Sequence, residues 1–380
     1  MHGGWTSRVA PAAILAAAIA LPAAAAPGSA ASPAAEAPGG RQLYAAACAS
    51  CHGADGRGAP LAAVGFAEPL PDFTDCSFAT REPDADWFAV SHDGGPARAF
   101  GRMMPAFGEA LSGAELQKAL DHVRTFCADR SWPRGELNLP RALFTEKAFP
   151  EDEAVFTTTV DSRGGPGAVV GEVVYEKRLG ARGQYEIVVP FAWREGVAAH
   201  AGESWVGGVG DLGLAVKRVL HHDLAAGRIW SAIGELKLPT GDEEEGFGKG
   251  TAIGEAFLAY GQILPADSFV QAQAGVEVPF EGGDAGEEAI LRVALGKSFT
   301  EGRFGRTWSP IVEVLGARGL ASGSREEWDL VPQLQVTLSR RQHVMANVGV
   351  RLPLDGSGEA SQVLFYVLWD WFDGGLFDGW

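Results

Sequence analysis

Long runs of alternating hydrophobic and polar residues fill the C-terminal half of this 380-residue chain. In the stretch FVQAQAGVEVPF (269–280), one parity is apolar throughout, whereas the other is mostly polar or small. The stretches WDLVPQLQVTLS (328–339) and HVMANVGVRLPL (343–354) alternate in the same way. A period of two residues is that of a β-strand with two different faces. Such long strands are unusual in globular proteins, where about 5–6 residues are typical, but a tilted strand needs about 9–11 to cross a membrane.

The spacing of these runs predicts an antiparallel transmembrane β-barrel over residues 154–380. Turn-forming stretches such as PTGDEEEGFGKG (239–250) and EGGDAGEE (281–288) separate about twelve strand candidates, a plausible number for an outer-membrane barrel. The apolar parity is then expected to face lipid and the polar parity a wet lumen. The alternative is a soluble antiparallel sandwich with one face exposed to water.

The N-terminus has the features of a signal peptide for export, assigned to residues 1–26. Arg8 supplies a positive charge, an apolar run follows at 12–21, and AAAA (23–26) offers a small-residue cleavage site. The run is too short for a membrane-spanning helix. Residues 27–40 are small and proline-rich, which indicates a flexible linker.

Residues 41–130 have helical periodicity instead. In SGAELQKALDHVRTFC (112–127), Ser112 and Glu115 form a capping box, and apolar residues then recur on one helical face. The segment RQLYAAACAS (41–50) is the natural partner for that face. Residues 131–153 contain three prolines, too many for a regular element, and are assigned as a linker between two domains.

The pentapeptide Cys48-Ala49-Ser50-Cys51-His52 is the attachment signal for a c-type haem. Two thiols at this spacing can add to the vinyl groups on one edge of the porphyrin, and the histidine is brought beneath the iron. A zinc site would need four ligands, and no second cysteine pair has matching spacing. A redox-active dithiol would require a βαβ pattern, which is missing here.

The opposite axial position of the iron requires a second ligand. Met103 and Met104 lie in GRMMPAFGEALSGAEL (101–116), just before the capped helix. A thioether ligand favours reduced iron and raises the potential. Core packing is the usual role of methionine, but two adjacent methionines before a proline in a loop fit it less well.

The two remaining cysteines, Cys76 and Cys127, lie outside the haem motif. Export places them in an oxidising compartment, where a disulfide between them is expected. The alternative is a buried free thiol at Cys127, which lies on the apolar face of the helix.

Together with GADGRG (53–58) and MPAF (104–107), the haem motif closely resembles that of class I c-type cytochromes over residues 40–130. The resemblance implies a small all-α domain with one covalently attached haem c. It implies that His52 and Met104 ligate the iron, with Met103 as the second choice. With both axial positions filled, the domain is expected to carry electrons rather than to act as an enzyme.

The C-terminal half resembles an outer-membrane barrel family associated with phenol meta-degradation operons. The resemblance rests on GDLGLAVKRVL (210–220), LPTGDEEEGFGKGT (238–251) and FLAYGQI (257–263), and it implies a barrel and at most a pore function. The net charge of −17 argues against nucleic acid as a partner, since phosphates would be repelled.

The sequence therefore predicts a multidomain protein, a monohaem cytochrome c domain anchored by a barrel of about 12 strands in the outer membrane. The cytochrome domain is expected in the periplasm, exchanging electrons with a redox partner protein or a small redox molecule. One alternative is an outer-membrane pore or transporter whose cytochrome domain senses redox state or a ligand. The other is a soluble periplasmic electron carrier with a β-sandwich module.

Overall fold

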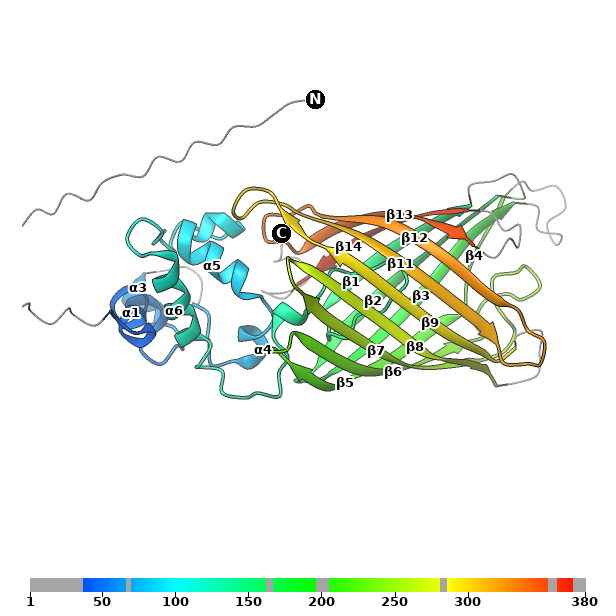
Figure 1. Ribbon diagram of the computed structural model, residues 1–380, viewed down its shortest axis with the longest axis horizontal. Helices are drawn as coiled ribbons and strands as arrows, with labels where there is room; N and C mark the ends of the chain where they lie inside the picture. Colours follow the sequence, from blue (N-terminus) through cyan, green and yellow to red (C-terminus); the bar gives the residue numbers. More distant parts are fainter. Residues whose placement is uncertain are drawn as a thin grey trace, which may run out of the picture. The chain divides into compact units, whose positions relative to one another are not determined.

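The computed structural model describes residues 37–65, 70–161, 167–195, 205–280, 286–354 and 361–371. The predicted signal peptide 1–26 and most of the predicted linker 27–40 lie outside these residues. The described residues form a group of short helices followed by a large antiparallel sheet (Figure 1). None of the described helices is long and apolar enough to cross a membrane.

The helical region consists of six α-helices and two 3-10 turns within the described residues. They are α1 (Gly40–Ala47), α2 (Ala49–His52), α3 (Leu61–Val64), α4 (Cys76–Ala79), α5 (Asp84–Asp93), η1 (Gly95–Arg98), α6 (Gly113–Val123) and η2 (Gly135–Leu137). The capping box that was predicted for α6 is confirmed. Ser112 accepts the backbone N–H of Glu115, and the Glu115 carboxylate accepts the backbone N–H of Ser112.

Helices α1 and α6 pack against each other, as the apolar face of α6 predicts. Tyr44 of α1 is buried and makes edge contacts with the rings of His122 and Phe126. The helices approach closely at Gly40, where an added β-carbon would lie 2.0 Å from the carbonyl oxygen of Lys118. Glycine at this position therefore allows the contact that brings the haem motif, which follows α1, onto the helical core.

A disulfide joins Cys76, at the start of α4, to Cys127, just beyond α6. The predicted pairing is confirmed, and the two cysteines of the haem motif are free thiols. The crosslink closes a loop with a sequence separation of 51 residues. It thereby ties the middle of the helical region to its end.

Removing this disulfide is expected to destabilise the helical region strongly. Chain entropy for a loop of this size predicts a loss of about 4 kcal/mol in Cys76→Ser/Cys127→Ser. Urea unfolding followed by helical circular dichroism measures the loss, and the wild-type protein in reductant should match the double variant. An unfolding midpoint unchanged by both treatments would contradict the prediction.

The sheet consists of long strands joined mainly as hairpins. The strands are β1 (Glu153–Asp161), β2 (Ala168–Leu179), β3 (Gly183–Glu195), β4 (Trp205–Val209), β5 (Leu212–Asp223), β6 (Arg228–Leu238), β7 (Ile253–Leu264), β8 (Ser268–Pro279), β9 (Glu288–Lys297), β10 (Phe299–Thr300), β11 (Thr307–Gly319), β12 (Glu326–Thr337), β13 (Val344–Pro353) and β14 (Gln362–Asp370). Strands β4 and β5 both pair with β3, and β9 and β10 both pair with β11. The described strands therefore occupy twelve positions.

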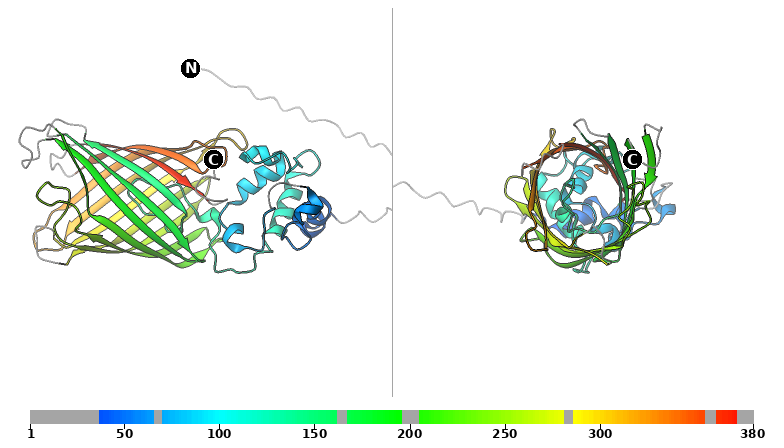
Figure 2. Two further views of the ribbon diagram at one scale, coloured as in Figure 1. Left: turned by 180° about the vertical axis from the view of Figure 1, so that it is seen from behind. Right: turned by 90° about the vertical axis from the view of Figure 1, so that its right-hand side faces the viewer.

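The sheet closes on itself because β1 pairs antiparallel with β14 over its whole length, from Glu153↔Asp370 to Asp161↔Gln362. Seen end-on, the strands form a ring (Figure 2). The predicted multidomain fold, with a helical region before an antiparallel barrel of about twelve strands, is confirmed. Closure leaves no second layer, so the soluble sandwich is not what this sequence forms.

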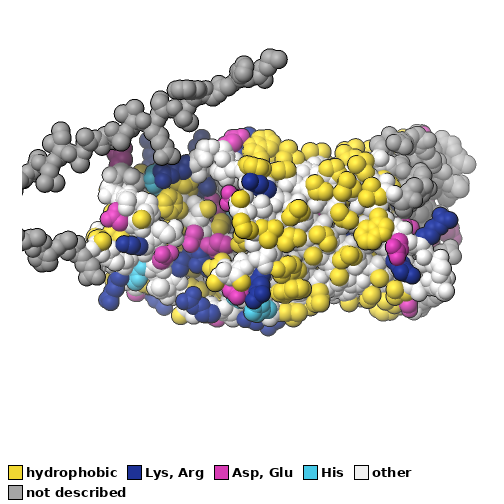
Figure 3. All heavy atoms as spheres, in the orientation of Figure 1, with side chains coloured by type: hydrophobic (Ala, Val, Ile, Leu, Met, Phe, Trp, Pro, Cys, Tyr) yellow, Lys and Arg dark blue, Asp and Glu magenta, His cyan; other side chains and the backbone are white. Residues whose placement is uncertain are grey.

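The two faces of the barrel wall differ as the alternation predicts. On β8, Gln271 and Gln273 are buried in the interior while Val276 is exposed outside; on β12, Gln333 is buried and Leu334 exposed. Hydrophobic side chains cover the wall in Figure 3, and charged side chains gather toward its ends. The outer wall is thus suited to lipid and the interior to polar groups.

Much of the proline-rich segment 131–153, from Leu137 onward, lies inside the end of the barrel where β1 begins. It contains η2 and otherwise no regular element, as its prolines predict. Leu137 and Phe149 pack against inward-facing Ile229 and Phe257, whereas Leu139 and Ala142 pack against Phe269, Ala294 and Ile311. The assignment of this segment as a linker between two domains did not include a position inside the barrel.

Candidate functional site

The two cysteines of the haem motif lie where one helix ends and another begins. Cys48 follows α1 and precedes α2, which holds Cys51 and His52. Both thiols are half-buried. Burial raises the pKa of the Cys48 thiol, and neighbouring Cys51 raises it further. The pair therefore presents two free thiols, one helical turn apart, at the edge of the helical core.

His52 offers an unpaired ring nitrogen. Among the described residues, its buried Nδ1 has no hydrogen-bond partner. Burial lowers the pKa of the imidazole, which favours the neutral form that can ligate a metal. The chain around it is fixed, because the Tyr44 hydroxyl donates a hydrogen bond of 2.6 Å to the carbonyl oxygen of Gly53.

Aromatic side chains cluster beside His52. The ring centroid of Phe73 lies 5.1 Å from that of His52 and 5.3 Å from that of Trp87, and Phe78 contacts both Phe73 and Trp87. The Arg124 guanidinium lies over Trp87, 3.7 Å from the ring centroid. These rings form an apolar wall of the kind that a flat macrocycle needs.

The predicted methionines lie on the loop between α5 and α6. Met103 is 56% exposed, and Met104 is half-buried. The carbonyl oxygen of Met104 accepts the Gly95 N–H at 3.0 Å, and Gly94, with φ +82°, approaches the same oxygen. Since an added β-carbon at Gly94 would lie 3.0 Å from that oxygen, glycine permits the close approach that holds the loop.

Comparison with known families supports this interpretation. Residues 35–123 match the family model described as cytochrome c oxidase, cbb3-type, subunit III. This is a c-type cytochrome match. It implies haem c as the cofactor of the helical region, and it spans the haem motif and both methionines.

About three-fifths of the chain is similar to several solved barrels at low sequence identity. One is the COG4313 outer membrane channel from Pseudomonas putida F1, with 11% identity, 61% of this chain and 100% of that chain covered, and a TM-score of 0.43. The KdgM porin has 9% identity, coverage of 58% and 99%, and a TM-score of 0.37. The beta domain of the Bordetella autotransporter BrkA has 12% identity, coverage of 58% and 98%, and a TM-score of 0.36. No curated protein matches the chain.

The residues of the motif fit a covalently bound haem. Two free thiols lie one turn apart, a neutral imidazole with an orphaned nitrogen follows them, and aromatic rings supply an apolar wall. The sequence did not single out Phe73, Trp87 or Arg124, because aromatic residues at irregular spacing carry no local signal of a shared site.

A second polar centre lies inside the barrel, around Glu313 of β11. Its carboxylate is fully buried and accepts the backbone N–H groups of Leu143, Phe144 and Thr145 at 3.0, 3.2 and 2.7 Å. It also accepts the Thr145 hydroxyl at 2.7 Å and the Gln333 side-chain amide. One wall residue thus fixes three consecutive residues of the lumen segment.

The lumen segment also carries two buried cations. Arg141 contacts Glu153 and Glu176 at 2.7 Å each, and its carbonyl oxygen accepts the Tyr366 hydroxyl at 2.6 Å. Lys147 contacts Glu153 at 3.2 Å and also pairs with Glu151. Buried charges require such partners, so these pairs specify one position of the segment in the barrel.

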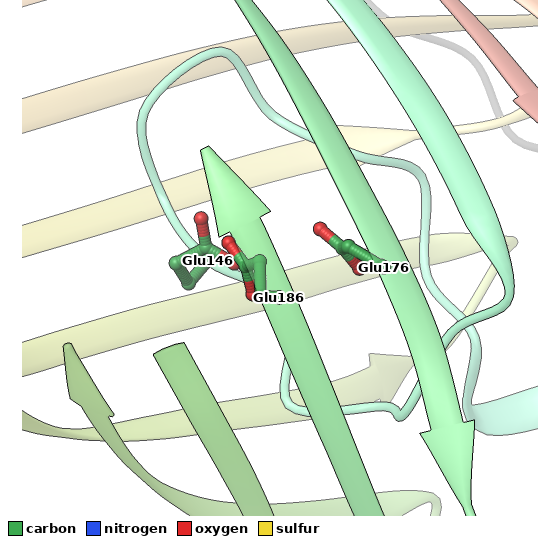
Figure 4. A group of neighbouring side chains, drawn as sticks. All are labelled: Glu146, Glu176 and Glu186. Carbon is green, nitrogen blue, oxygen red and sulfur yellow. The ribbon is translucent and has the colours of Figure 1, made fainter. Parts of the chain in front are cut away.

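Three carboxylates converge beside Arg141 (Figure 4). Oxygen atoms of Glu146, Glu176 and Glu186 lie within 4.8 Å of one another, a spacing that metal sites also use. Here, however, Arg141 contacts two of them, and the Lys217 ammonium lies 3.8 Å from Glu146. Cations of the protein already pair with two of the three carboxylates, so we interpret the cluster as packing within the lumen.

Proposed function

We propose that this protein is a monohaem c-type cytochrome that transfers electrons at the periplasmic face of the outer membrane, anchored there by its barrel. The observation that carries the proposal is that the two free thiols of Cys48 and Cys51 lie beside the buried imidazole of His52, whose Nδ1 has no hydrogen-bond partner among the described residues. A closed barrel with an apolar outer wall supports the anchoring role. The signal peptide predicted at residues 1–26 would take the chain out of the cytoplasm.

In this proposal each residue of the motif has a separate task. Cys48 and Cys51 would hold the haem covalently, and His52 and Met104 would ligate its iron. Bound haem supplies one-electron redox chemistry. The protein would position it, keep water from it with Phe73 and Trp87, and set its potential through His52 and Met104.

The even number of barrel strands supports a periplasmic cytochrome. Both ends of the barrel then return to one side of the membrane, and in outer-membrane barrels this is the periplasmic side. A redox partner protein or a small redox molecule is the expected source or acceptor of the electrons. The segment that lies inside one end of the lumen argues against an unobstructed pore as the main activity.

One experiment tests both halves of the proposal. The full chain is extracted in detergent, run on a gel with and without boiling, and stained for covalent haem. We expect one haem-positive band whose mobility changes on boiling, as folded barrels show. A haem-positive protein that is soluble without detergent would contradict membrane anchoring, and an unstained band would contradict haem attachment.

Replacing Met104 tests the assignment of the axial ligand. In Met104→Ala we expect the reduction potential to fall by on the order of 0.1 V, because the thioether that favours reduced iron is lost. The reduced haem should also bind carbon monoxide. Met103→Ala is the matched control and should leave both properties unchanged; the opposite pattern would assign Met103 as the ligand.

A further inference from the structure

The outer wall of the barrel carries an arginine in an otherwise apolar row. On β5 the outward-facing side chains are Leu214, Val216, Arg218 and Leu220, and all four are exposed. The buried residues that alternate with them, such as Ala215 and Lys217, face the interior. Arg218 therefore projects from the surface that the proposed function places in the membrane.

The neighbours of Arg218 leave space around its side chain. Arg218 pairs with Gly183 of β3 on one side and with Ala232 of β6 on the other. Two residues earlier on β5, and on the same face, Val216 pairs with Gly234. These small residues line a hollow of about 490 Å³ on the barrel surface. Arg218, Leu179 and Val216 line it as well.

Arg218 differs from three other cations on the outer face, each of which contacts a carboxylate. The partners of those cations lie within reach: Lys177 contacts Asp152 at 2.7 Å, Arg228 contacts Asp223 at 3.7 Å, and Arg318 contacts Glu326 at 3.1 Å. Across the described parts of the chain, no carboxylate lies within 4.0 Å of the Arg218 guanidinium. An unpaired guanidinium on an apolar wall calls for an anion supplied by the surroundings.

The aromatic neighbours indicate where the hollow lies across the thickness of the membrane. Tyr185 pairs with Val216 on one side of Arg218, and Trp230 pairs with His221 on the other and contacts Tyr260 at 4.3 Å between ring centroids. Tyrosine and tryptophan gather where a membrane meets water. The short turn that joins β2 to β3 ends at Gly183, so the hollow lies at the end of the barrel where lipid headgroups are expected.

We propose that this hollow binds an anionic phospholipid. The headgroup phosphate pairs with the Arg218 guanidinium, whose planar fork matches phosphate oxygens. An acyl chain then follows Val216 and Leu214 along β5 toward the middle of the membrane. The proposal rests on the barrel spanning the outer membrane, which is the anchoring part of the proposed function.

Lipid titration of the detergent-purified full chain, followed by native mass spectrometry, tests the site. Dioleoyl phosphatidylglycerol is the probe. In Arg218→Gln we expect the tightest binding step to weaken about tenfold, and in Arg218→Lys by less, because a cation remains. Arg318→Gln, which removes an outward arginine near the opposite end of the barrel, is the matched control and should bind as the wild type does.

Two further measurements separate the lipid from other occupants. Gly234→Leu fills the hollow and leaves the charge, so it too should weaken binding about tenfold. Inorganic phosphate in large excess should not displace the lipid, since it lacks the acyl chain; full displacement would overturn the proposal in favour of a plain anion site. Equal binding by wild type and Arg218→Gln would overturn it as well.

The mobility shift on boiling distinguishes failure of this inference from failure of the proposed function. If every variant keeps its shift and its haem stain while Arg218→Gln binds lipid normally, only the lipid site is wrong. If the wild type itself shows no shift, the barrel is not a membrane anchor, and the basis of the lipid site fails with it.

Discussion

Replacing both Cys48 and Cys51 with alanine is expected to abolish covalent haem completely and to leave the barrel folded. The two thiols are the attachment points, and the disulfide occupies the other two cysteines, so the described chain offers no substitute. A haem stain of the denatured protein should be blank, while the mobility shift on boiling persists. The barrel is expected to survive because neither its strand pairings nor its contacts with the lumen segment involve these two cysteines.

Two sets of variants control this experiment. Ser50→Ala changes the residue between the thiols without removing either, and it should stain as the wild type does. Cys48→Ala and Cys51→Ala alone should each keep one thioether bond, which shifts the absorption spectrum of the pyridine haem complex. A double variant that still stains would contradict the assigned attachment.

Much of the fold was predictable because its signals are local. The strand periodicity from residue 154 onward encodes the two faces of the wall, and about twelve repeats imply closure. The capping box at Ser112 fixes the start of α6 from two residues three positions apart. The disulfide between Cys76 and Cys127 could be predicted because the haem motif contains the other two cysteines.

The contents of the lumen could not be predicted in this way. Glu313 binds residues about 170 positions away in the chain, and a contact of that range has no periodic signature. The prolines of 131–153 correctly indicate irregular backbone, but irregular backbone suits an exposed linker and a buried plug equally well. The available signal was the presence of charged residues at strand positions that face the interior, such as Glu176, Lys217 and Glu313. Such charges need partners inside the barrel.

Glu313→Ala is expected to release the lumen segment. The substitution leaves the three backbone N–H groups of residues 143–145 and the Thr145 hydroxyl without their acceptor, at a cost on the order of 3 kcal/mol or more. In the wild type, Arg141 and Lys147 are held in the interior and should resist trypsin. In the variant the segment spends more time outside its position, so trypsin should cut there and separate the haem-stained fragment from the barrel.

The same gel contains the control and the result that would contradict the prediction. Glu327→Ala removes an exposed carboxylate from the neighbouring strand β12 and should stay as resistant as the wild type. Ion conductance in a planar bilayer should rise in Glu313→Ala alone, because the segment lies across one end of the lumen. If the variant resists trypsin and conducts no better, the remaining pairs of Arg141 and Lys147 suffice to hold the segment, and the hydrogen bonds to Glu313 contribute little. Either result measures how much one buried carboxylate contributes to keeping the cytochrome tether inside its anchor.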